Sequence, residues 1–212
     1  MKAHPLMLVA ILAGATAITI RTFAEGKRMV QPKTPAADTL PIEGELPSLG
    51  GATEAAADWG SLKSPENYVG FERSENFASP GGTVPDTRRV YTAPAPARLG
   101  LNHWALAGEW TVGKQATVLH RANGRILYRF HARDLHLVMG PAASGTSVRF
   151  RVSIDGRPPG AAHGVDVDDQ GNGTVTEQRM YQLIRQPGAI ADRLFEIEFL
   201  DPGVETFAFT FG

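Results

Sequence analysis

The sequence contains no cysteine. That absence excludes disulfide bonds, thiolate metal ligands and thiol redox chemistry from this chain. An excess of either charge is also missing, because 21 Lys and Arg residues stand against 22 Asp and Glu residues. We therefore expect no nucleic-acid partner and no polybasic membrane surface. The sequence also carries no P-loop, no dinucleotide-binding glycine motif and no nucleophile elbow, so we predict that the protein is not an enzyme.

Residues 1–24 have the layout of a targeting segment. Lys2 and His4 precede an uncharged apolar run over residues 5–20, which we expect to form a helix. The run is shorter than the about 20 residues of a spanning helix, and small residues at 22–24 offer a cleavage site for a secretory signal. An uncleaved membrane anchor is the alternative. Both predictions place the rest of the chain outside the cytoplasm, periplasmic or secreted, with membrane contact only through this segment.

Residues 25–64 are interpreted as an extended tether. Proline, glycine and alanine are frequent there, and Leu40, Ile42 and Leu46 repeat at neither the helical nor the strand period. We therefore expect no regular element within residues 25–64.

From residue 65 onward, apolar and polar residues alternate in short runs. The clearest runs are Arg125–His131, Leu135–Met139, Val148–Ile154, Phe195–Phe199 and Phe207–Phe211. Period two places the apolar residues on one face of a strand and the polar residues on the other. Turn dipeptides such as Asn-Gly and Asp-Gly separate the runs. About eight such strands predict an all-β fold for residues 65–212, an antiparallel two-sheet β-sandwich of jelly-roll type.

Several long strings in this part of the chain resemble one known module. They are LNHWALAGEWTVG (101–113), GRILYRFHARDLHLVMGP (124–141), PPGAAHGVDVDDQGNGTVTEQRMYQLIRQPG (158–188) and FEIEFLDPGVETFAFTFG (195–212). The module is the C-terminal domain of DipZ-type cytochrome c biogenesis proteins and related extracytoplasmic thioredoxin-family proteins. The resemblance implies a β-sandwich similar to carbohydrate-binding modules.

The resemblance also implies a missing domain. In family members a thioredoxin fold with an active-site cysteine pair precedes the β-sandwich. Here LPIEGELPSLGGATE (40–54) resembles the lead-in to that fold, and WGSLKSPENYVGFERSENFASPGG (59–82) resembles the segment after it. The two strings nearly adjoin, so the resemblance implies that the redox domain is absent. Without a thiolate nucleophile the chain cannot exchange thiols and disulfides.

Trp104, Trp110 and Tyr128 are candidate ligand-binding residues, because sugar rings stack on flat aromatic faces. The two tryptophans lie six residues apart, a spacing that places them on one face of an unbroken strand. The alternative is that both fill the core of the sandwich.

His131 and His136 complete the set of candidate ligand-binding residues. They flank the string Ala-Arg-Asp-Leu, which predicts a tight hairpin that brings the two imidazoles together. A metal site there would need a third ligand such as Asp134, and a surface role with ordinary hydrogen bonds is the alternative.

Asp166, Asp168, Gln170 and Glu177 nearly match the spacing of a calcium-binding loop. They occupy positions 1, 3, 5 and 12 of that loop, and Gly171 occupies position 6. Calcium is therefore a candidate cofactor, and we expect no other. The alternative is a hairpin in which the strands VDVD and GTVT are joined by the turn DQGN.

Two pairs of charged residues alternate along predicted strands. Glu196 and Glu198 share a strand face at a separation that overlaps the carboxyl spacing of glycosidases, and a solvated face is the alternative. Arg149 and Arg151 share another face, which could meet an acidic ligand or serve solubility.

Three hypotheses for function follow. The first is an exported, non-catalytic binding module for a glycan or an envelope protein. The second is an accessory domain of a thiol-disulfide oxidoreductase or cytochrome c biogenesis system, acting with a separate thioredoxin-fold partner. The third is a folded remnant of an internal deletion that has no present function.

Overall fold

The computed structural model describes residues 58–212. The predicted signal or anchor with its apolar helix, and most of the predicted tether, lie outside the described residues. None of the helices formed by residues 58–212 is long and apolar enough to cross a membrane.

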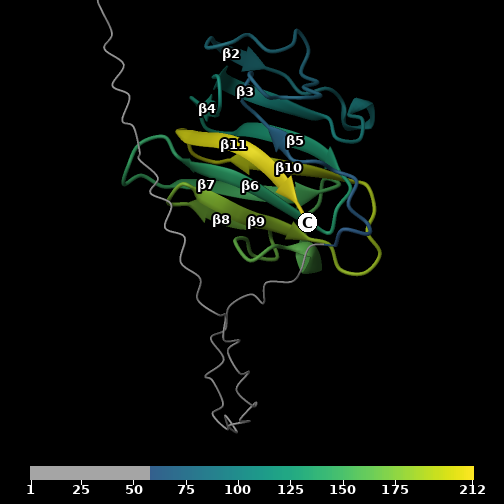
Figure 1. Cartoon of the computed structure of the whole chain (residues 1–212). Helices are drawn as coiled ribbons and strands as arrows, with labels where there is room; N and C mark the ends of the chain where they lie inside the picture. The colour runs from purple at the N-terminus through teal and green to yellow at the C-terminus, as the bar shows by residue number, and fades with distance from the viewer. Residues whose placement is uncertain (1–57) are drawn as a thin grey trace, which may run out of the picture. The chain divides into compact units, whose positions relative to one another are not determined.

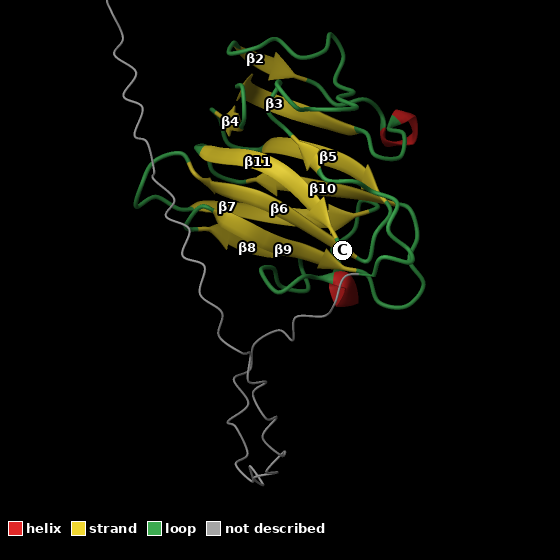
Figure 2. Cartoon of the chain, viewed as in Figure 1, coloured by secondary structure: helices red, strands yellow, loops and turns green. Residues whose placement is uncertain are grey.

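Residues 58–212 are almost entirely β-structure, as the alternating runs predict (Figure 2). The strands are β1 (Asn67–Tyr68), β2 (Arg88–Tyr91), β3 (Trp104–Val112), β4 (Thr117–Leu119), β5 (Gly124–Phe130), β6 (Asp134–Pro141), β7 (Val148–Ile154), β8 (Asn172–Val175), β9 (Arg179–Arg185), β10 (Arg193–Phe199) and β11 (Val204–Phe211). Two short 3₁₀ helices, η1 (Pro96–Arg98) and η2 (Gly160–Ala162), lie in the connections. The sequence prediction missed the short strands β1, β2 and β4, whose few residues give little alternation, and also the longer β9.

The strands form two sheets that share strand β3. The first sheet has the order β8-β7-β10-β5-β3, and the second has the order β3-β4-β11-β6-β9, with β1 beside β11 and β2 beside β3. All of these strand pairs are antiparallel. The first half of β3 pairs with β5 and the second half pairs with β2 and β4. The prediction of an antiparallel two-sheet sandwich is therefore confirmed.

The bend that lets β3 join both sheets occurs at Gly108. This residue has a φ of 103°, which side chains rarely tolerate, and it separates the residues that pair with β5 from those that pair with β4. A Cβ atom at this position would also lie 2.9 Å from the Cα atom of Gly124. The bend therefore requires glycine for both its conformation and its space.

The core lies between the inner faces of the two sheets. Phe195, Ile197 and Phe199 of β10 point inward and are fully buried, as the alternation predicts. From the other sheet, Phe209 of β11, the yellow strand in Figure 1, meets Phe195 with ring centroids 6.1 Å apart. Burial of these large side chains from both sheets is the main source of stability.

Two predicted hairpins are wrong. The segment from His131 to His136 does not join paired strands, because β5 lies between β10 and β3 while β6 lies between β11 and β9. Residues 165–168 form no strand, and β8 pairs with β7. After β5 a short connection carries the chain from one sheet to the other, whereas residues 165–168 belong to the long connection between β7 and β8 of the same sheet. Proximity in sequence predicts a hairpin only when both strands have a free edge facing each other.

Replacing Gly108 by alanine tests the bend in β3. We expect Gly108→Ala to lower the free energy of unfolding by about 2–4 kcal/mol, because the substitution adds a strained φ and a clash. Chemical denaturation provides the measurement. Gly145→Ala is the matched control, since Gly145 also has a positive φ, 76°, but open space around its Cβ position. Equal losses in the two variants would contradict a steric role for Gly108.

Candidate functional site

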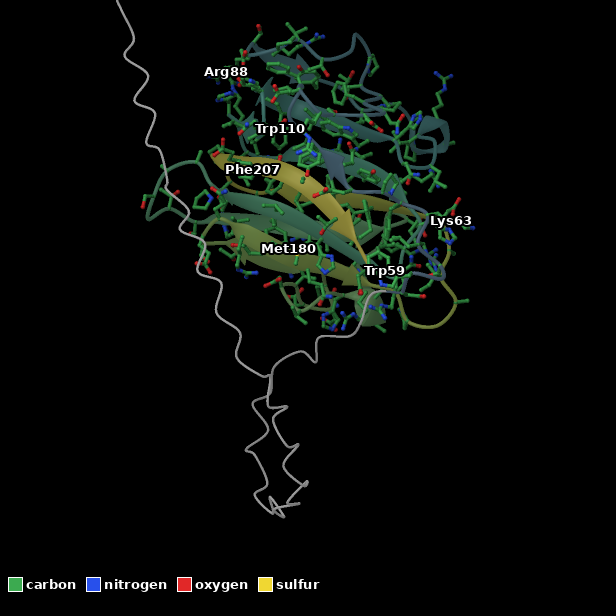
Figure 3. The ribbon with its side chains drawn as sticks, in the orientation of Figure 1. Trp59, Lys63, Arg88, Trp110, Met180 and Phe207 are labelled. Atoms are coloured by element: carbon green, nitrogen blue, oxygen red, sulfur yellow. The ribbon has the colours of Figure 1, made fainter. Side chains whose placement is uncertain are left out.

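Trp104, Trp110 and Tyr128 are buried in the core, with at most 1% of each residue exposed. The Trp104 Nε1 donates a hydrogen bond to a backbone carbonyl oxygen at 3.0 Å, and the Trp110 Nε1 (labelled in Figure 3) does so at 2.8 Å. Burial also raises the pKa of the Tyr128 hydroxyl to about 12. The core interpretation of the tryptophans is therefore confirmed, and none of the three rings offers a face to a ligand.

His131 and His136 have separate partners. His131 Nδ1 lies 2.5 Å from an Asp192 carboxylate oxygen, whereas His136 Nε2 lies 3.4 Å from the amide nitrogen of Gln182. Burial lowers the pKa of the His136 imidazole, because its charged form would lose solvation. The predicted approach of the two imidazoles rested on the hairpin that the structure lacks.

Asp134, the expected third metal ligand, instead forms ion pairs with two arginines. Its carboxylate is almost fully buried between two guanidinium groups, that of Arg133 at 2.6 Å and that of Arg185 at 2.7 Å. Two such partners compensate the cost of burying the charge. Asp134 therefore stabilises the β6–β9 pair in the structure.

The acidic residues of the predicted calcium loop do not converge. Asp166 accepts hydrogen bonds from the Arg179 guanidinium and from the Gln182 backbone N–H, both at 2.7 Å. Glu177 projects into solvent and lies 3.5 Å from the same guanidinium. Within residues 58–212 no three histidine, aspartate or glutamate side chains are placed to hold a metal ion.

Asp168 instead organises its own turn. One of its carboxylate oxygens accepts hydrogen bonds from the backbone N–H groups of Gln170 and Asn172, at 3.0 and 2.7 Å. The Asn172 side chain also donates to this carboxylate, and these bonds hold the pKa of Asp168 below its usual value. This local turn reproduces part of the spacing of a calcium loop without bringing Gln170 and Asp168 together as ligands.

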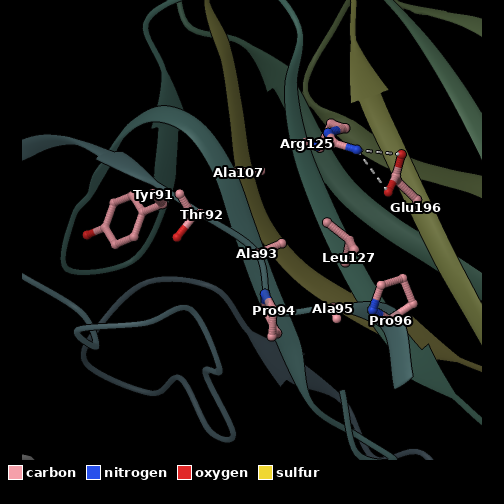
Figure 4. A pocket seen from close by; sticks show the side chains of 10 residues that line it. All are labelled: Tyr91, Thr92, Ala93, Pro94, Ala95, Pro96, Ala107, Arg125, Leu127 and Glu196. Carbon is pink, nitrogen blue, oxygen red and sulfur yellow. Dashed lines mark hydrogen bonds and ion pairs between the residues drawn. The ribbon is translucent and has the colours of Figure 1, made fainter. Parts of the chain in front are cut away.

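An open groove lies on the outer face of the first sheet. Arg125 and Leu127 of β5 and Glu196 of β10 line one side, and the segment Thr92–Pro96 passes over the other (Figure 4). The groove has a volume of about 510 Å³. Its floor belongs to a small apolar cluster, separate from the main core, that includes Leu127 and Leu194.

Arg125 and Glu196 form the polar part of this groove. The Arg125 Nη1 donates to both carboxylate oxygens at 3.4 Å, and the side chains are 44% and 29% exposed. At this length and exposure the pair is weak, and both groups keep donors and acceptors available to a ligand. Glu198 lies on the same outer face, opposite Arg125, as the alternation predicts. The groove therefore presents charges of both signs above an apolar floor.

A second hollow extends the groove along the sheet. It has a volume of about 330 Å³ and shares Pro96 and Glu196 with the first. Arg129 holds its rim in place by donating hydrogen bonds to the carbonyl oxygens of Leu99 and Pro96, at 2.6 and 2.9 Å. The combined groove suits an extended ligand. Sequence reasoning missed its rim, although the alternation of alanine and proline over residues 93–97 marks an extended segment.

Arg149 is neutralised by a residue of its own chain. Its Nε and Nη2 donate to the two carboxylate oxygens of Asp201, each at 2.9 Å. This bidentate contact lowers the pKa of Asp201 to about 2. Arg151 donates to the side-chain oxygen of Asn172 at 3.1 Å. The two arginines therefore belong to the surface of the sandwich and do not form a shared anion site.

These features define an antiparallel β-sandwich domain with an open groove on one sheet face. Residues 64–212 match the family described as the thioredoxin-like C-terminal domain, and the chain belongs to that family.

Two curated relatives, both called Protein DipZ, come from Mycobacterium bovis and Mycobacterium tuberculosis. Each is 30% identical to this chain over 95 residues, which cover 45% of the chain and 12% of the relative. The chain thus matches only a small part of these longer proteins. Among solved structures, a family two carbohydrate esterase from Cellvibrio japonicus is similar over 51% of this chain and 30% of its own, with 13% identity and a TM-score of 0.39.

Calcium is expected to leave the stability of the protein unchanged. The carboxylates of Asp166 and Asp168 already accept hydrogen bonds from N–H donors, so binding would have to break those bonds. Thermal melts in millimolar calcium and in chelator provide the measurement. A rise in Tm with calcium, abolished by Asp168→Asn, would show that the loop rearranges around the ion.

The Asp201 carboxyl is expected to titrate with a midpoint of about 2. Because this value lies below the unfolded value near 3.8, the Arg149 contact stabilises the fold fully above pH 4 and ceases to do so as pH falls through 2. NMR titration of the carboxyl carbon measures the midpoint. Arg149→Gln should raise it toward 3.8, and Arg151→Gln is the control that should leave it in place.

Proposed function

We propose that this domain is a non-catalytic binding module that acts outside the cytoplasm and holds an extended segment of a protein partner in its groove. The observation that carries the proposal is the pair Arg125 and Glu196, which lies half exposed above an apolar floor. Such a surface offers apolar contact along the floor and one donor and one acceptor group for orientation. The groove is open along its length, which suits a chain rather than an enclosed small molecule.

The absence of cysteine supports a role without electron transfer. The chain contains no thiolate nucleophile, so any contribution to a thiol-disulfide system has to come through binding. Membership in a family described as thioredoxin-like C-terminal domains supports a thioredoxin-fold protein as the partner. In that role the domain would act as an accessory domain, which joins the first two hypotheses into one.

A protein segment fits the groove better than a sugar stacked on an aromatic ring. The only aromatic residue that lines the groove is Tyr91, which is 2% exposed. A glycan is the second candidate, because the guanidinium of Arg125 and the carboxylate of Glu196 can donate to and accept from neighbouring hydroxyl groups. Both candidates use the same two side chains.

A photo-crosslinking amino acid at Ala95 tests the groove in the full chain. Ala95 is exposed on the groove rim, so a bound partner would lie within reach of the probe. We expect a specific adduct with a thioredoxin-fold protein of the envelope, and Arg125→Glu should reduce its yield about tenfold through repulsion from Glu196 and loss of the donor. The same probe at Ala143, in the exposed β6–β7 connection, is the matched control.

The competing outcomes are distinct. Equal adducts at Ala95 and Ala143, or an adduct insensitive to Arg125→Glu, would contradict the groove as the binding surface. A glycan array that is positive for the chain and negative for Arg125→Glu, with no protein adduct at Ala95, would replace the protein partner by a glycan.

A further inference from the structure

A β-bulge in β11 turns one aromatic side chain away from the core. The register between β11 and β6 shifts between Thr206 and Ala208, which leaves Phe207 unpaired with β6. Thr206 and Ala208 are buried, whereas Phe207, labelled in Figure 3, is only partly buried. The backbone carbonyl of Phe207 still accepts a hydrogen bond from Val69 at 2.9 Å. Bulges commonly re-aim a side chain in this way, and here the phenyl ring reaches the outer surface.

The ring of Phe207 lines a pocket of about 280 Å³ on the outer side of the second sheet. The other lining residues are Tyr68, Gly70, Glu72, Arg73, Lys114 and Gln115. None of them lines the groove between β5 and β10, so the two sites are separate. A space of this volume accommodates one aromatic side chain.

Gly70 allows two backbone segments of the pocket wall to pack directly against each other. A Cβ atom at this position would lie 2.5 Å from the Cα atom of Gln115 and 2.6 Å from the carbonyl oxygen of Lys114. The absence of a side chain therefore lets the 114–115 turn pack directly on the strand end that carries Tyr68. A backbone hydrogen bond also joins these two segments, because the N–H of Glu72 donates to the Lys114 carbonyl oxygen at 3.1 Å.

The rim of the pocket carries an excess of positive charge. Lys114 pairs with Glu72 at 3.1 Å, and both side chains are exposed. The guanidinium carbon of Arg73 lies 3.4 Å from the centroid of the Tyr68 ring. Within residues 58–212 Arg73 has no carboxylate partner, so its donors remain available while stacking holds the group in place. The rim therefore has one more cation than anions.

We propose that this pocket binds an aromatic group that carries a carboxylate, as found at the C-terminal residue of a peptide that ends in phenylalanine or tyrosine. The ligand ring packs against Phe207 and the edge of Tyr68, and the carboxylate accepts hydrogen bonds from the Arg73 guanidinium. A planar carboxylate matches the fork of guanidinium donors, and an aromatic neighbour adds apolar contact. Glu72 opposes the ligand charge and limits its affinity.

NMR titration of the full chain tests the pocket with four probes. The probes are N-acetyl-phenylalanine, its primary amide, the tripeptide Gly-Gly-Phe and its C-terminal amide. We expect the two carboxylates to produce saturable shifts of backbone amides at residues 68–73, 114–115 and 207, and the two amides to produce little change. Tighter binding of the tripeptide than of N-acetyl-phenylalanine identifies a peptide C-terminus as the source of the carboxylate, and the reverse identifies a small aromatic acid.

Single substitutions test which side chains of the pocket contact the ligand. Arg73→Gln should weaken binding of the carboxylates about tenfold, since it removes the charge-assisted hydrogen bonds. Glu72→Gln should strengthen binding about threefold, because it removes an exposed negative charge from the rim. Phe207→Ala should abolish saturation. Arg157→Gln, at an exposed site on a different surface, is the matched control and should change nothing.

Equal binding of the carboxylates and the amides would overturn the proposal, as would binding that Arg73→Gln leaves intact. Absence of saturable shifts with all four probes would also overturn it. Shifts confined to residues 125–129 and 194–196 would place the ligand in the groove instead. None of these results depends on the partner proposed for the groove, because the two sites share no lining residue.

Discussion

The architecture depends on one backbone constraint, the bend of β3 at Gly108. Because the two halves of a single strand belong to different sheets, the sandwich is joined by a continuous backbone at one corner. The bend directs Trp104 and Trp110 into the same core from the two sheets. It also places β5 beside the first half of β3, so that the outer side chains of β5 form the side of the groove. A straight β3 could pair with the strands of only one sheet, so the other sheet would lose its edge strand.

Pairing of charges separates structural residues from candidate binding residues. Asp134, Asp166 and Asp201 each accept close hydrogen bonds from an arginine of the same domain. These contacts satisfy the carboxylates and leave little capacity for a ligand. Arg125 with Glu196 and Arg73 with Tyr68 differ, because the first contact is long and the second uses only the face of the guanidinium. The groups that keep unused donors and acceptors lie in the groove and in the pocket lined by Phe207.

The family and the composition together limit the chemistry of this chain. Residues 64–212 belong to the thioredoxin-like C-terminal family, yet the chain has no cysteine with which to perform thiol exchange. The curated relatives are much longer, and this chain matches about an eighth of their length. A binding role is consistent with a domain that contributes surfaces rather than reactive groups. Its two sheets carry two different surfaces, one mixed in charge and one aromatic and cationic.

The sequence by itself determined the exclusion of thiol chemistry, the positions of the strands with clear alternation and the faces of those strands that enter the core. Each of these follows from local information, since composition and a period of two do not depend on which strands become neighbours. The alternation of Phe195 to Phe199 therefore predicted both the buried rings and the outward glutamates. The wrong prediction of a hairpin at residues 131–136 shows the limit of that information. Both edges of β5 and of β6 are paired with other strands, so β5 and β6 do not pair with each other.

Only the tertiary structure decided which polar groups could serve a ligand. Asp166 and Asp168 have nearly the spacing of calcium ligands, but an arginine and a glutamine from β9 engage the first, and the second closes its own turn. The bulge at Phe207 is equally invisible in a run that alternates regularly from Phe207 to Phe211. Whether a charge is free or neutralised, and whether a ring faces core or solvent, depends on long-range neighbours. The fold class could therefore be obtained from the sequence, whereas the groove and the pocket could not.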